Sequence, residues 1–544
     1  MELSLSLIAG ASAALFVLWL LLRDFIVRSP IDDLPGPPSP HAVVGHIFEV
    51  FGKKGWQFTR DVSETYGPVS KLRAFLGGPM LLVHDPKALH SLLIKDAEFY
   101  PKCAAPFDEF MLLLGPSLFT TEGAQHRRQR KQLNPVFSIA HLRNMTELFY
   151  DIAHRAIKAI ENRVGPSQAG EIIDVNGWMA RTTLEMLGQA ALGYSFDNFI
   201  EDSTDAFGES LKAFFPTYSR VAVIGFIVPI VSYVLPQPLV RGILSLIPQT
   251  DVQRILHISR TIAQRSKEII NEKKMALMKG DDELKHKVGE GKDLMSILLK
   301  ANMLAAEDER LTDEELVAQM SIFILAGMDT TANALTRTLQ VLAEHPEEQE
   351  KLRSELAEAR NGNDISYDAL DKLAYLDAVC RETLRVYSPV NVIGRAASKD
   401  MSLPLLNPVV AKDGSLMNSI PVPTGAWVLA NIQASNCNRA LWGPDAYEWK
   451  PERWLQPAPH TLEDARIPGV YSHLMTFSGG SRSCIGFKFS QLEMKVVLSL
   501  LVSSFKFELT DKPISWNTSG VSYPTMSEDS DRPEMLLKVT KVVA

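Results

Sequence analysis

One long helical pattern constrains the fold of this chain more than any other feature of its sequence. Thr312 precedes the pattern and Glu315 follows three residues later, which is the capping box of a helix start. The pattern runs from Asp313 to Glu344 and stops at His345-Pro346, because the residue before a proline avoids the α region. At about 1.5 Å per residue, this helix is roughly 48 Å long and can cross a whole domain. Its length favours one large helical domain over several small ones.

The rest of the chain after residue 40 has no other clear domain boundary. Val69 to Phe75 and Met80 to Val83 flank a Gly-Gly-Pro turn and predict a β-hairpin. Met401 to Gly425, which Pro and Gly interrupt, predicts short strands, and the charged stretch Gly280 to Asp293 predicts an exposed loop. We therefore expect a single domain over residues 41–544, mainly α with a minor β part.

A membrane anchor is predicted at the N-terminus. Leu3 to Leu22 contains no charged residue, and twenty helical residues span roughly 30 Å, the thickness of a bilayer core. A cleaved signal peptide would carry a basic segment before a shorter apolar run, but Arg23 and Arg28 follow this run and only Glu2 precedes it. The positive-inside rule then places the body of the protein in the cytosol. We expect residues 1–22 to be an uncleaved transmembrane helix, with a buried core helix as the alternative.

A proline-rich segment separates this anchor from the rest. Residues 34–40 read Leu-Pro-Gly-Pro-Pro-Ser-Pro and cannot continue a helix, because proline fixes φ and lacks a backbone donor. The segment is either an ordinary linker or a semi-rigid spacer that orients the body against a membrane. We assign residues 23–40 to a juxtamembrane segment with a Pro-rich hinge.

The composition excludes several classes of protein. Hydrophobic residues make up 46% and charged residues 22%, which is the balance of a chain with a sizeable core. The formal net charge of −8 argues against a nucleic-acid binder, which would carry a basic excess. Cys103, Cys380, Cys437 and Cys484 are far apart, which argues against a disulfide scaffold and against a zinc site made mainly of thiolates.

Three short motifs could carry chemistry. Ala326 to Thr331 reads Ala-Gly-Met-Asp-Thr-Thr in the middle of the long helix, where a local widening could house a ligand. The alternative is a glycine packing kink with threonine hydroxyls bonded back to carbonyls. Glu382 and Arg385 lie three residues apart in a second helical pattern and can form an ion pair, which needs further partners if it is buried. Arg453 is a candidate partner.

The third motif is a Gly- and Ser-rich stretch, Phe477 to Gly486, which precedes an apolar helical pattern from Phe487 to Phe505. A cysteine before a helix start, here Cys484, meets the positive end of the helix dipole, which favours the thiolate. The glycines let the backbone approach something flat and bulky, Phe477 can shield the sulfur, and Arg482 supplies a cation for an acidic group. A buried free cysteine in a turn is the alternative.

This spacing resembles the haem-binding signature F-x-x-G-x-R-x-C-x-G of the cytochrome P-450 family. The matching residues are Phe477, Gly480, Arg482, Cys484 and Gly486. Ala326 to Thr331 resembles the family's oxygen-activation motif A-G-x-D-T-T, and Glu382, Arg385 and Arg453 resemble its buried triad. The anchor and proline-rich segment are similar to those of microsomal members, and the style of the signature resembles that of fungal, especially basidiomycete, members. The resemblance implies the cytochrome P-450 fold, with the long central helix over a haem and one transmembrane helix before it.

The resemblance also implies roles for individual residues. Cys484 would be the axial thiolate of the haem iron, which favours O–O cleavage. Asp329 and Thr330 would be the acid–alcohol pair that delivers protons during oxygen activation. The expected partners of the haem propionates are His126, which stands where many members have Trp, Arg130, Arg395 and Arg482. The expected substrate-pocket residues are Phe107, Phe110, Phe323, Ala326, Val390 and Val392.

The implied reaction is a monooxygenation, in which one atom of O2 enters a C–H bond and the other leaves as water. No flavin or nicotinamide domain is visible in the sequence, so the electrons would come from NADPH through the flavins of cytochrome P-450 reductase, or from cytochrome b5. The basic cluster Arg127, Arg128, Arg130 and Lys131 either docks such an acidic partner or is a solvated helix face. A haem-thiolate isomerase or dehydratase that rearranges a peroxide, and a non-catalytic membrane scaffold, are the alternatives; Asp329 and Thr330 favour the monooxygenase.

The expected substrate is a neutral, rigid, lipophilic molecule such as a triterpenoid, a sesquiterpenoid or a sterol-like compound of secondary metabolism, since many basidiomycete members oxidise terpenoids. The apolar run Val221 to Val231 would roof the pocket and touch the membrane, with simple core burial as the alternative. A fatty acid or a xenobiotic is the alternative substrate. The expected location is the endoplasmic reticulum membrane, with a single span and the catalytic domain in the cytosol.

Overall fold

The computed structural model describes Trp19 and residues 27–102, 104–165, 169–200, 206–225, 228, 231, 235–279 and 292–542. The predicted anchor, apart from Trp19, and most of the predicted loop Gly280 to Asp293 lie outside these residues. Within the described part of the chain, no helix is both long and apolar enough to span a membrane. The anchor and its orientation stay predictions.

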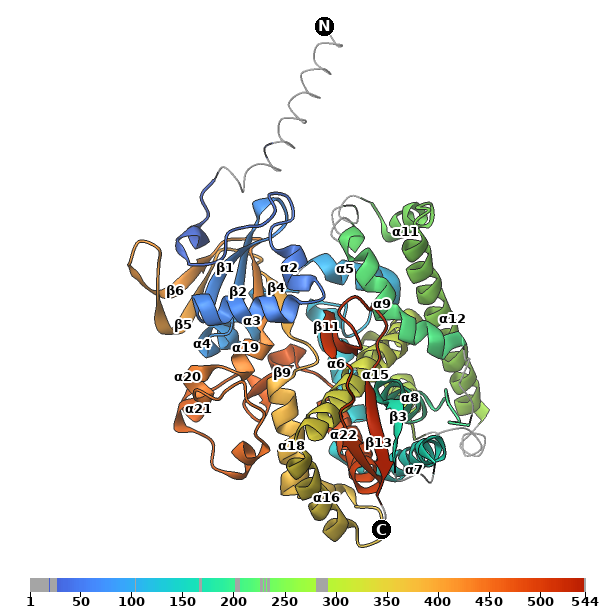
Figure 1. Ribbon diagram of the computed structural model, residues 1–544. Coiled ribbons are helices and arrows are strands. Elements are labelled where there is room, and N and C mark those ends of the chain that lie inside the picture. The colour runs from blue at the N-terminus through green and yellow to red at the C-terminus, as the bar shows by residue number, and fades with distance from the viewer. Residues whose placement is uncertain are drawn as a thin grey trace. The chain divides into compact units, whose positions relative to one another are not determined.

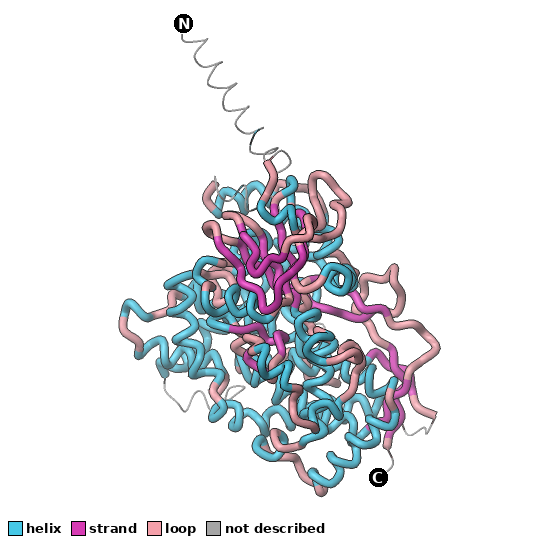
Figure 2. Tube along the Cα trace, turned by 90° about the vertical axis from the view of Figure 1, so that its left-hand side faces the viewer, coloured by secondary structure: helices cyan, strands magenta, loops and turns pink. Residues whose placement is uncertain are grey.

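The chain forms two compact units, each built from distant parts of the sequence (Figure 1). The first unit comprises Met1–Cys103, Asn391–Ala446 and Pro459–Ser483, and the second comprises Ala104–Val390, Tyr447–Ala458 and Cys484–Ala544. Helices dominate the described residues and strands form a minor part (Figure 2). The expectation of a mainly α protein with a minor β part is therefore confirmed, and the single domain over residues 41–544 stays a prediction.

The first unit contains a four-stranded sheet of order β1-β2-β7-β4. Its strands are β1 (Val69–Arg73), β2 (Pro79–Val83), β4 (Val392–Ala396) and β7 (Trp427–Asn431). β1 and β2 pair antiparallel across the Gly-Gly-Pro turn, which confirms the predicted hairpin. One face of this sheet packs on helix α3 (Gly55–Tyr66), with Leu72, Met80 and Leu429 fully buried between them.

The other strands of the first unit form hairpins. The predicted short strands after residue 400 are present as β5 (Met401–Val410) and β6 (Leu416–Val422), and β8 (Gly469–Tyr471) pairs with β9 (Leu474–Gly479). The short helices of this unit are η1 (Pro30–Asp33), α2 (Ile47–Phe51), η2 (Phe75–Gly77), α4 (Pro86–His90), η3 (Ser91–Lys95), η4 (Ala97–Phe99), α19 (Ile432–Asn436), α20 (Arg439–Trp442), α21 (His460–Ala465) and η9 (Gly480–Arg482).

The end of the proline-rich segment belongs to this folded unit. Ile31 and Leu34 are fully buried. The backbone N–H of Lys71 in β1 donates to the carbonyl of Pro35 at 2.9 Å. No helix or strand covers residues 35–39, as the prolines predict. At least this part of the predicted hinge is therefore fixed against the first unit.

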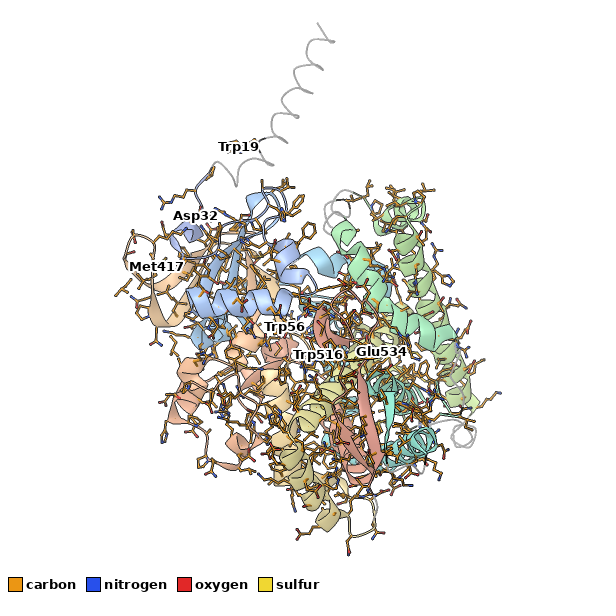
Figure 3. The ribbon with its side chains drawn as sticks, viewed as in Figure 1. Trp19, Asp32, Trp56, Met417, Trp516 and Glu534 are labelled. Carbon is orange, nitrogen blue, oxygen red and sulfur yellow. The ribbon has the colours of Figure 1, made fainter. Side chains whose placement is uncertain are left out.

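The second unit is built around α15 (Asp313–Glu344), whose bounds are those predicted. Thr312 Oγ1 accepts from the Glu315 N–H at 3.2 Å, and Glu315 Oε2 accepts from the Thr312 N–H at 2.9 Å, so the capping box is present. Most side chains of α15 are buried, because the helix packs against α8 (Val175–Leu187), α12 (Thr250–Lys279) and α22 (Phe487–Ser504). Figure 3 shows the side chains on the ribbon.

The remaining elements of the second unit surround this centre. The helices are α5 (Ala104–Leu114), α6 (Gly123–Leu133), η5 (Asn134–Phe137), α7 (Ile139–Val164), η6 (Gly188–Leu192), α9 (Ala206–Gly225), α11 (Gln237–Ser245), α14 (Leu294–Leu304), η7 (Glu307–Glu309), α16 (Pro346–Arg360), α17 (Tyr367–Leu370), α18 (Ala374–Val386) and η8 (Pro451–Leu455). The strands β10 (Phe505–Glu508), β13 (Leu536–Lys541) and β3 (Glu171–Asp174) form one sheet, and β11 (Ser515–Ser519) and β12 (Val521–Thr525) form a hairpin.

Candidate active site

The centre of α15 carries Asp329 and Thr330. Thr330 Oγ1 donates to the carbonyl of Ala326 at 2.7 Å. A Cβ on Gly327 would lie 2.9 Å from a methyl carbon of Leu187, so the glycine permits close packing of α15 on α8. The packing alternative for this motif is thus present, α15 is assigned as α-helix through the motif, and the local widening stays a prediction. Ala326 is nevertheless exposed between buried neighbours, so one face of the helix is open there.

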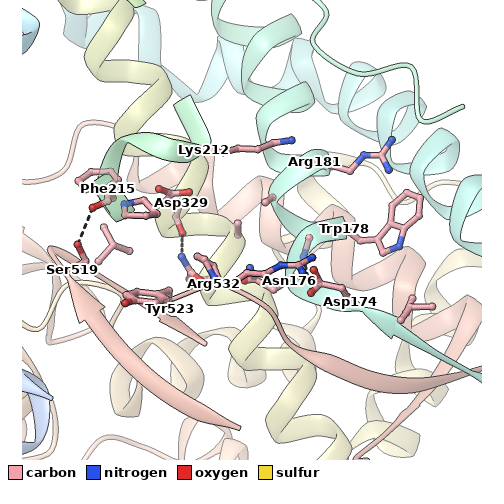
Figure 4. Close-up of a pocket in the computed structure, with 18 of the residues that line it drawn as sticks. Asp174, Asn176, Trp178, Arg181, Lys212, Phe215, Asp329, Ser519, Tyr523 and Arg532 are labelled. Carbon is pink, nitrogen blue, oxygen red and sulfur yellow. Dashed lines mark hydrogen bonds between the residues drawn. The ribbon is translucent and has the colours of Figure 1, made fainter. Parts of the chain in front are cut away.

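Asp329 borders a cavity of about 610 Å³ in the second unit (Figure 4). Asp329, Ala332 and Asn333 line it from one face of α15, and Asn333 Nδ2 donates to the Asp329 carbonyl at 2.7 Å. The Asp329 side chain is half-buried. Desolvation still raises the pKa of its carboxyl to about 7. A carboxyl with this pKa gains and loses a proton near neutral pH, which suits a proton-transfer group.

The loop before Cys484 runs through β9 and the turn η9. The ring of Phe477 meets the ring of Tyr471 edge-on, with centroids 5.6 Å apart. Gly480 has a φ of +70°, and a Cβ there would lie 2.0 Å from the carbonyl oxygen of Leu93. Glycine is therefore required at this position both by conformation and by space.

Cys484 lies three residues before the start of α22. It is exposed, whereas Cys380 and Cys437, the other cysteines that the structure describes, are buried. Desolvation raises the pKa of the Cys484 thiol, while the Gly486 N–H and the positive charge of Arg130 lower it. The expectation that groups at the helix start favour the thiolate is confirmed for the Gly486 N–H, although desolvation raises the pKa of the thiol overall. A bound cation would reverse this balance.

His126 and Arg130 lie one turn apart on α6 in the same unit as Cys484. His126 is buried, and Arg130 Nε donates to Asn134 Oδ1 at 2.9 Å. Burial lowers the pKa of Arg130, and the Cys484 thiolate raises it, which places the two charges within electrostatic reach of each other. The role of Arg130 toward a haem propionate stays a prediction.

The other expected haem partners belong to the first unit. Arg395 in β4 is buried, and its Nη1 donates to the Gly394 carbonyl at 2.8 Å. Arg482 is half-buried in η9. Their roles toward a haem stay predictions.

The predicted triad is assembled in the second unit. Arg385 Nε lies 2.8 Å from Glu382 Oε2, and neither side chain is exposed. Arg453 Nε lies 3.5 Å from Glu382 Oε1. Trp454 Nε1 and the Lys450 N–H each donate to Glu382 at 2.9 Å, and Arg385 Nη2 donates to the Glu448 carbonyl at 3.1 Å. The buried charges therefore have the additional partners that they need.

The expected substrate residues that the structure describes lie on several elements, and Phe110 and Phe323 pack against different aromatic rings. Phe110 packs with Phe119, Phe214 and Tyr218 in an aromatic group between α5 and α9. Phe323 is buried edge-on against Phe137, with ring centroids 5.5 Å apart. The side chain of Phe107 lies outside the described residues.

Val390 is half-buried in the second unit, whereas Val392 packs against the sheet core of the first. Of the apolar run 221–231, Val221 and Val228 are buried, as the core-burial alternative predicts.

Sequence reasoning missed most of the residues around the Asp329 cavity. They come from α7, β3, α8, α9, the β11–β12 hairpin and the segment before β13, and no motif links these segments. The labelled side chains of Figure 4 include Asn176, Trp178, Lys212, Tyr523 and Arg532. Only tertiary folding brings them together, so no local pattern could have found them.

The residues around Cys484 fit a haem. Within the described residues, no group of three or more His, Cys, Asp or Glu side chains could hold a metal ion. A single exposed thiol suits a metal that brings its other ligands, as the iron of a porphyrin does. A Cβ on Gly486 would meet nothing closer than a ring carbon of Phe137 at 4.0 Å, which leaves room beside the sulfur. Arg130 supplies a cation nearby.

Comparisons with known proteins agree with this reading. The family model of cytochrome P-450 matches residues 35–527. A ganoderic acid synthetase of Ganoderma lucidum is 59% identical over 542 residues, covering 98% of each chain. Cytochrome P-450 monooxygenase 91 of Postia placenta is 49% identical over 530 residues, covering 97% of each chain. A cytochrome P-450 monooxygenase of Hericium erinaceus is 36% identical over 522 residues, covering 93% of this chain and 94% of its own. The chain belongs to the cytochrome P-450 family of monooxygenases.

Proposed function

We propose that this chain is a membrane-anchored monooxygenase that hydroxylates a lipophilic terpenoid at an unactivated carbon, with electrons from NADPH-cytochrome P-450 reductase. The observation that carries the proposal is the exposed Cys484 beside Arg130 at the start of α22, in the same unit as the Asp329–Thr330 pair. The haem iron needs a thiolate ligand, and the activation of O2 needs a proton source. Cys484 and the Asp329–Thr330 pair are the residues that we propose for these two roles.

The haem, when bound, supplies the activation of O2. Cys484 Sγ is the ligand that the chain offers to the iron, and Arg130, His126, Arg395 and Arg482 are the proposed partners of the propionates. The Asp329 carboxyl, whose pKa is about 7, takes protons from the cavity side of α15. The Thr330 hydroxyl donates to the Ala326 carbonyl and lies on the helix face where Ala326 is exposed. We assign to it the transfer of these protons toward the bound haem.

Two observations support a terpenoid substrate. The relative at 59% identity is named a ganoderic acid synthetase. The second is the packed aromatic group of Phe110, Phe119, Phe214 and Tyr218, which we propose backs the substrate pocket as a rigid apolar wall. Rigid, fused-ring substrates fit such a wall with little loss of conformational entropy, whereas a fatty acid would lose many rotamers on binding.

The membrane and the redox partner complete the proposal. Leu239 and Ile243 of α11 and Leu246 after it are exposed, and an exposed apolar group of this kind suits contact with lipid. On α6, Arg128 pairs with the buried Glu315 and Lys131 pairs with Glu309, so the basic cluster is partly neutralised. Arg127 stays exposed and is the cation that we assign to an acidic reductase or to cytochrome b5. The proposed location is the endoplasmic reticulum membrane, with the catalytic domain in the cytosol.

The proposal is tested by turnover in microsomes that contain the chain and the reductase. A panel of triterpenoids, sesquiterpenoids, sterols, fatty acids and a lipid hydroperoxide is supplied with and without NADPH, and Cys484→Ala is the control. We expect NADPH-dependent hydroxylation of at least one terpenoid. Turnover of the hydroperoxide without NADPH would instead identify an isomerase or dehydratase, and turnover of fatty acids alone would refute the terpenoid assignment.

A further inference from the structure

Arg337 of α15 lies between two aromatic rings. Its guanidinium carbon is 3.7 Å from the ring centroid of Trp516 in β11 and 4.2 Å from that of Tyr387, which follows α18. Trp516 is labelled in Figure 3. A planar guanidinium stacks on aromatic faces in a way that a lysine ammonium cannot reproduce. One side chain therefore holds three segments of the second unit together.

A shared acceptor reinforces this contact. Gln340 Oε1 accepts from Trp516 Nε1 at 2.7 Å and from Arg337 Nη1 at 3.3 Å. Arg337 and Gln340 lie three residues apart and share a face of α15 with Asn333, which lines the Asp329 cavity. The arrangement fixes the base of the β11–β12 hairpin against the same face of the helix that borders the cavity.

Burying the Arg337 guanidinium between these rings costs free energy. Desolvation lowers its pKa to about 9, and its Nε has no hydrogen-bond partner in the described part of the chain. A buried donor without a partner costs free energy, so an apolar side chain of similar size would serve stability equally well. The arginine is better explained by the orientation that its two stacked faces impose on Trp516 and Tyr387.

The segments that Arg337 joins include Val390, an expected pocket residue, and part of the wall of the Asp329 cavity. Ser519, Val521 and Tyr523 of the hairpin line the Asp329 cavity, and Ser519 Oγ donates to the Phe215 carbonyl of α9 at 3.1 Å. The Ser522 N–H donates to the Pro389 carbonyl at 2.8 Å, which links the hairpin to the segment between Tyr387 and Val390. A shift at the base of the hairpin would therefore move both this segment and the cavity wall.

We propose that Arg337 is a positioning residue that fixes the β11–β12 hairpin and residues 387–390 against α15 and thereby determines which carbon of the substrate is oxidised. The assignment of the oxidised carbon rests on the proposed terpenoid hydroxylation. The positioning itself does not, and it can be measured without turnover.

The first test is hydrogen–deuterium exchange of the full-length, haem-loaded protein. Arg337→Leu should raise exchange of amides 515–525 roughly tenfold, while peptides from α7 and α22 keep the wild-type rates. Arg337→Lys should raise it as well, because it keeps the charge but loses the stacking, and it carries the test if the leucine variant does not fold. Arg265→Lys is the matched control. The guanidinium carbon of Arg265 lies 5.3 Å from the ring centroid of Tyr194, and neither residue belongs to the hairpin. Unchanged exchange at 515–525, or an equal rise in all peptides, would overturn the proposal.

The second test uses Trp516 and the products. Trp516→Leu should reproduce the effect of Arg337→Leu, Trp516→Phe should largely preserve wild-type exchange, and the double variant should be no worse than either leucine variant alone. For each terpenoid that the wild type hydroxylates, both leucine variants should change the ratio of product isomers at least threefold without loss of the thiolate-type ferrous–CO band. A constant ratio would refute the role in selectivity. If the wild type hydroxylates no terpenoid, the proposed function fails, and the exchange experiment alone decides the positioning role.

Discussion

Glu382 and Arg385 form an ion pair in which neither side chain is exposed to solvent, with Arg385 Nε 2.8 Å from Glu382 Oε2. The pair is stable in this setting because Glu382 also accepts from Trp454 and from the Lys450 backbone, and Arg385 also donates to the Glu448 carbonyl. The geometry ties α18 to η8. Its loss would leave an uncompensated charge in the interior of the second unit.

Arg385→Lys should therefore be strongly destabilising although it keeps the positive charge. Lysine cannot supply the two-pronged contact, and breaking a buried pair costs about 3–5 kcal/mol. The measurements are the midpoint of urea unfolding and the yield of haem-loaded protein. Arg143→Lys is the control, because Arg143 and its partner Asp368 are exposed, and it should change neither quantity. Equal behaviour of the two variants would contradict this account of the pair.

Local patterns in the sequence predicted the parts of the molecule that depend on near neighbours. The capping box and the proline fixed both ends of α15, and the spacing of Glu382 and Arg385 predicted their contact. The direction of the Cys484 pKa shift could not be predicted, because desolvation depends on what packs around the sulfur. The Asp329 cavity and the stacking of Arg337 on Trp516 could not be predicted either, since they join segments that are far apart in the chain.

Asp329 should make stability depend on pH. Its folded-state pKa of about 7 lies above the ordinary value of 3.8, so the folded protein binds more protons than the unfolded chain between these values. The free energy of unfolding therefore falls as the pH rises from 4 to 7 through this group. Asparagine has no proton to lose, so Asp329→Asn removes this pH-dependent fall in the free energy of unfolding. The free energy of unfolding of the variant should therefore exceed that of the wild type by more at pH 8 than at pH 4. Allowing for the partial exposure of Asp329, the difference should exceed about 1 kcal/mol.

Urea unfolding of both proteins at pH 4 and pH 8 measures this difference. Asp413→Asn is the control, since Asp413 is exposed and its pKa is lowered by Ser415 rather than raised. A stability gain of Asp329→Asn that is the same at both values of pH would show that the carboxyl ionises as it does in water.

Thr330→Ala should separate electron uptake from product formation. The variant keeps α15 and the haem spectrum, but it loses the hydroxyl that passes protons on, so reducing equivalents leave as hydrogen peroxide. Coupling of NADPH oxidation to hydroxylation should fall about tenfold or more. Thr338→Ala is the matched control, because Thr338 makes the same bond to a carbonyl one turn back, to Ala334 at 2.8 Å, but is buried. Wild-type coupling in Thr330→Ala would remove Thr330 from the relay.

Glycosylation tests the predicted orientation in the membrane. Asn144 and Asn517 lie in N-x-S/T sequons, and with the body in the cytosol neither should carry a glycan. Asn144 is the informative site, because it is exposed on α7, whereas Asn517 is fully buried in β11. A sequon added ahead of Met1 is the positive control and should be modified. An endoglycosidase-sensitive mass shift that Asn144→Gln abolishes would place the body in the lumen.

The central claim is that Cys484 is the ligand of a haem iron, and the ferrous–CO difference spectrum tests it most directly. Wild-type protein should show the red-shifted band of a thiolate-ligated haem. Cys380→Ala and Cys437→Ala should keep it, because these cysteines are buried. Cys484→Ala should lose the band completely, since no other cysteine that the structure describes is exposed. An unchanged red-shifted band in Cys484→Ala would contradict the assignment.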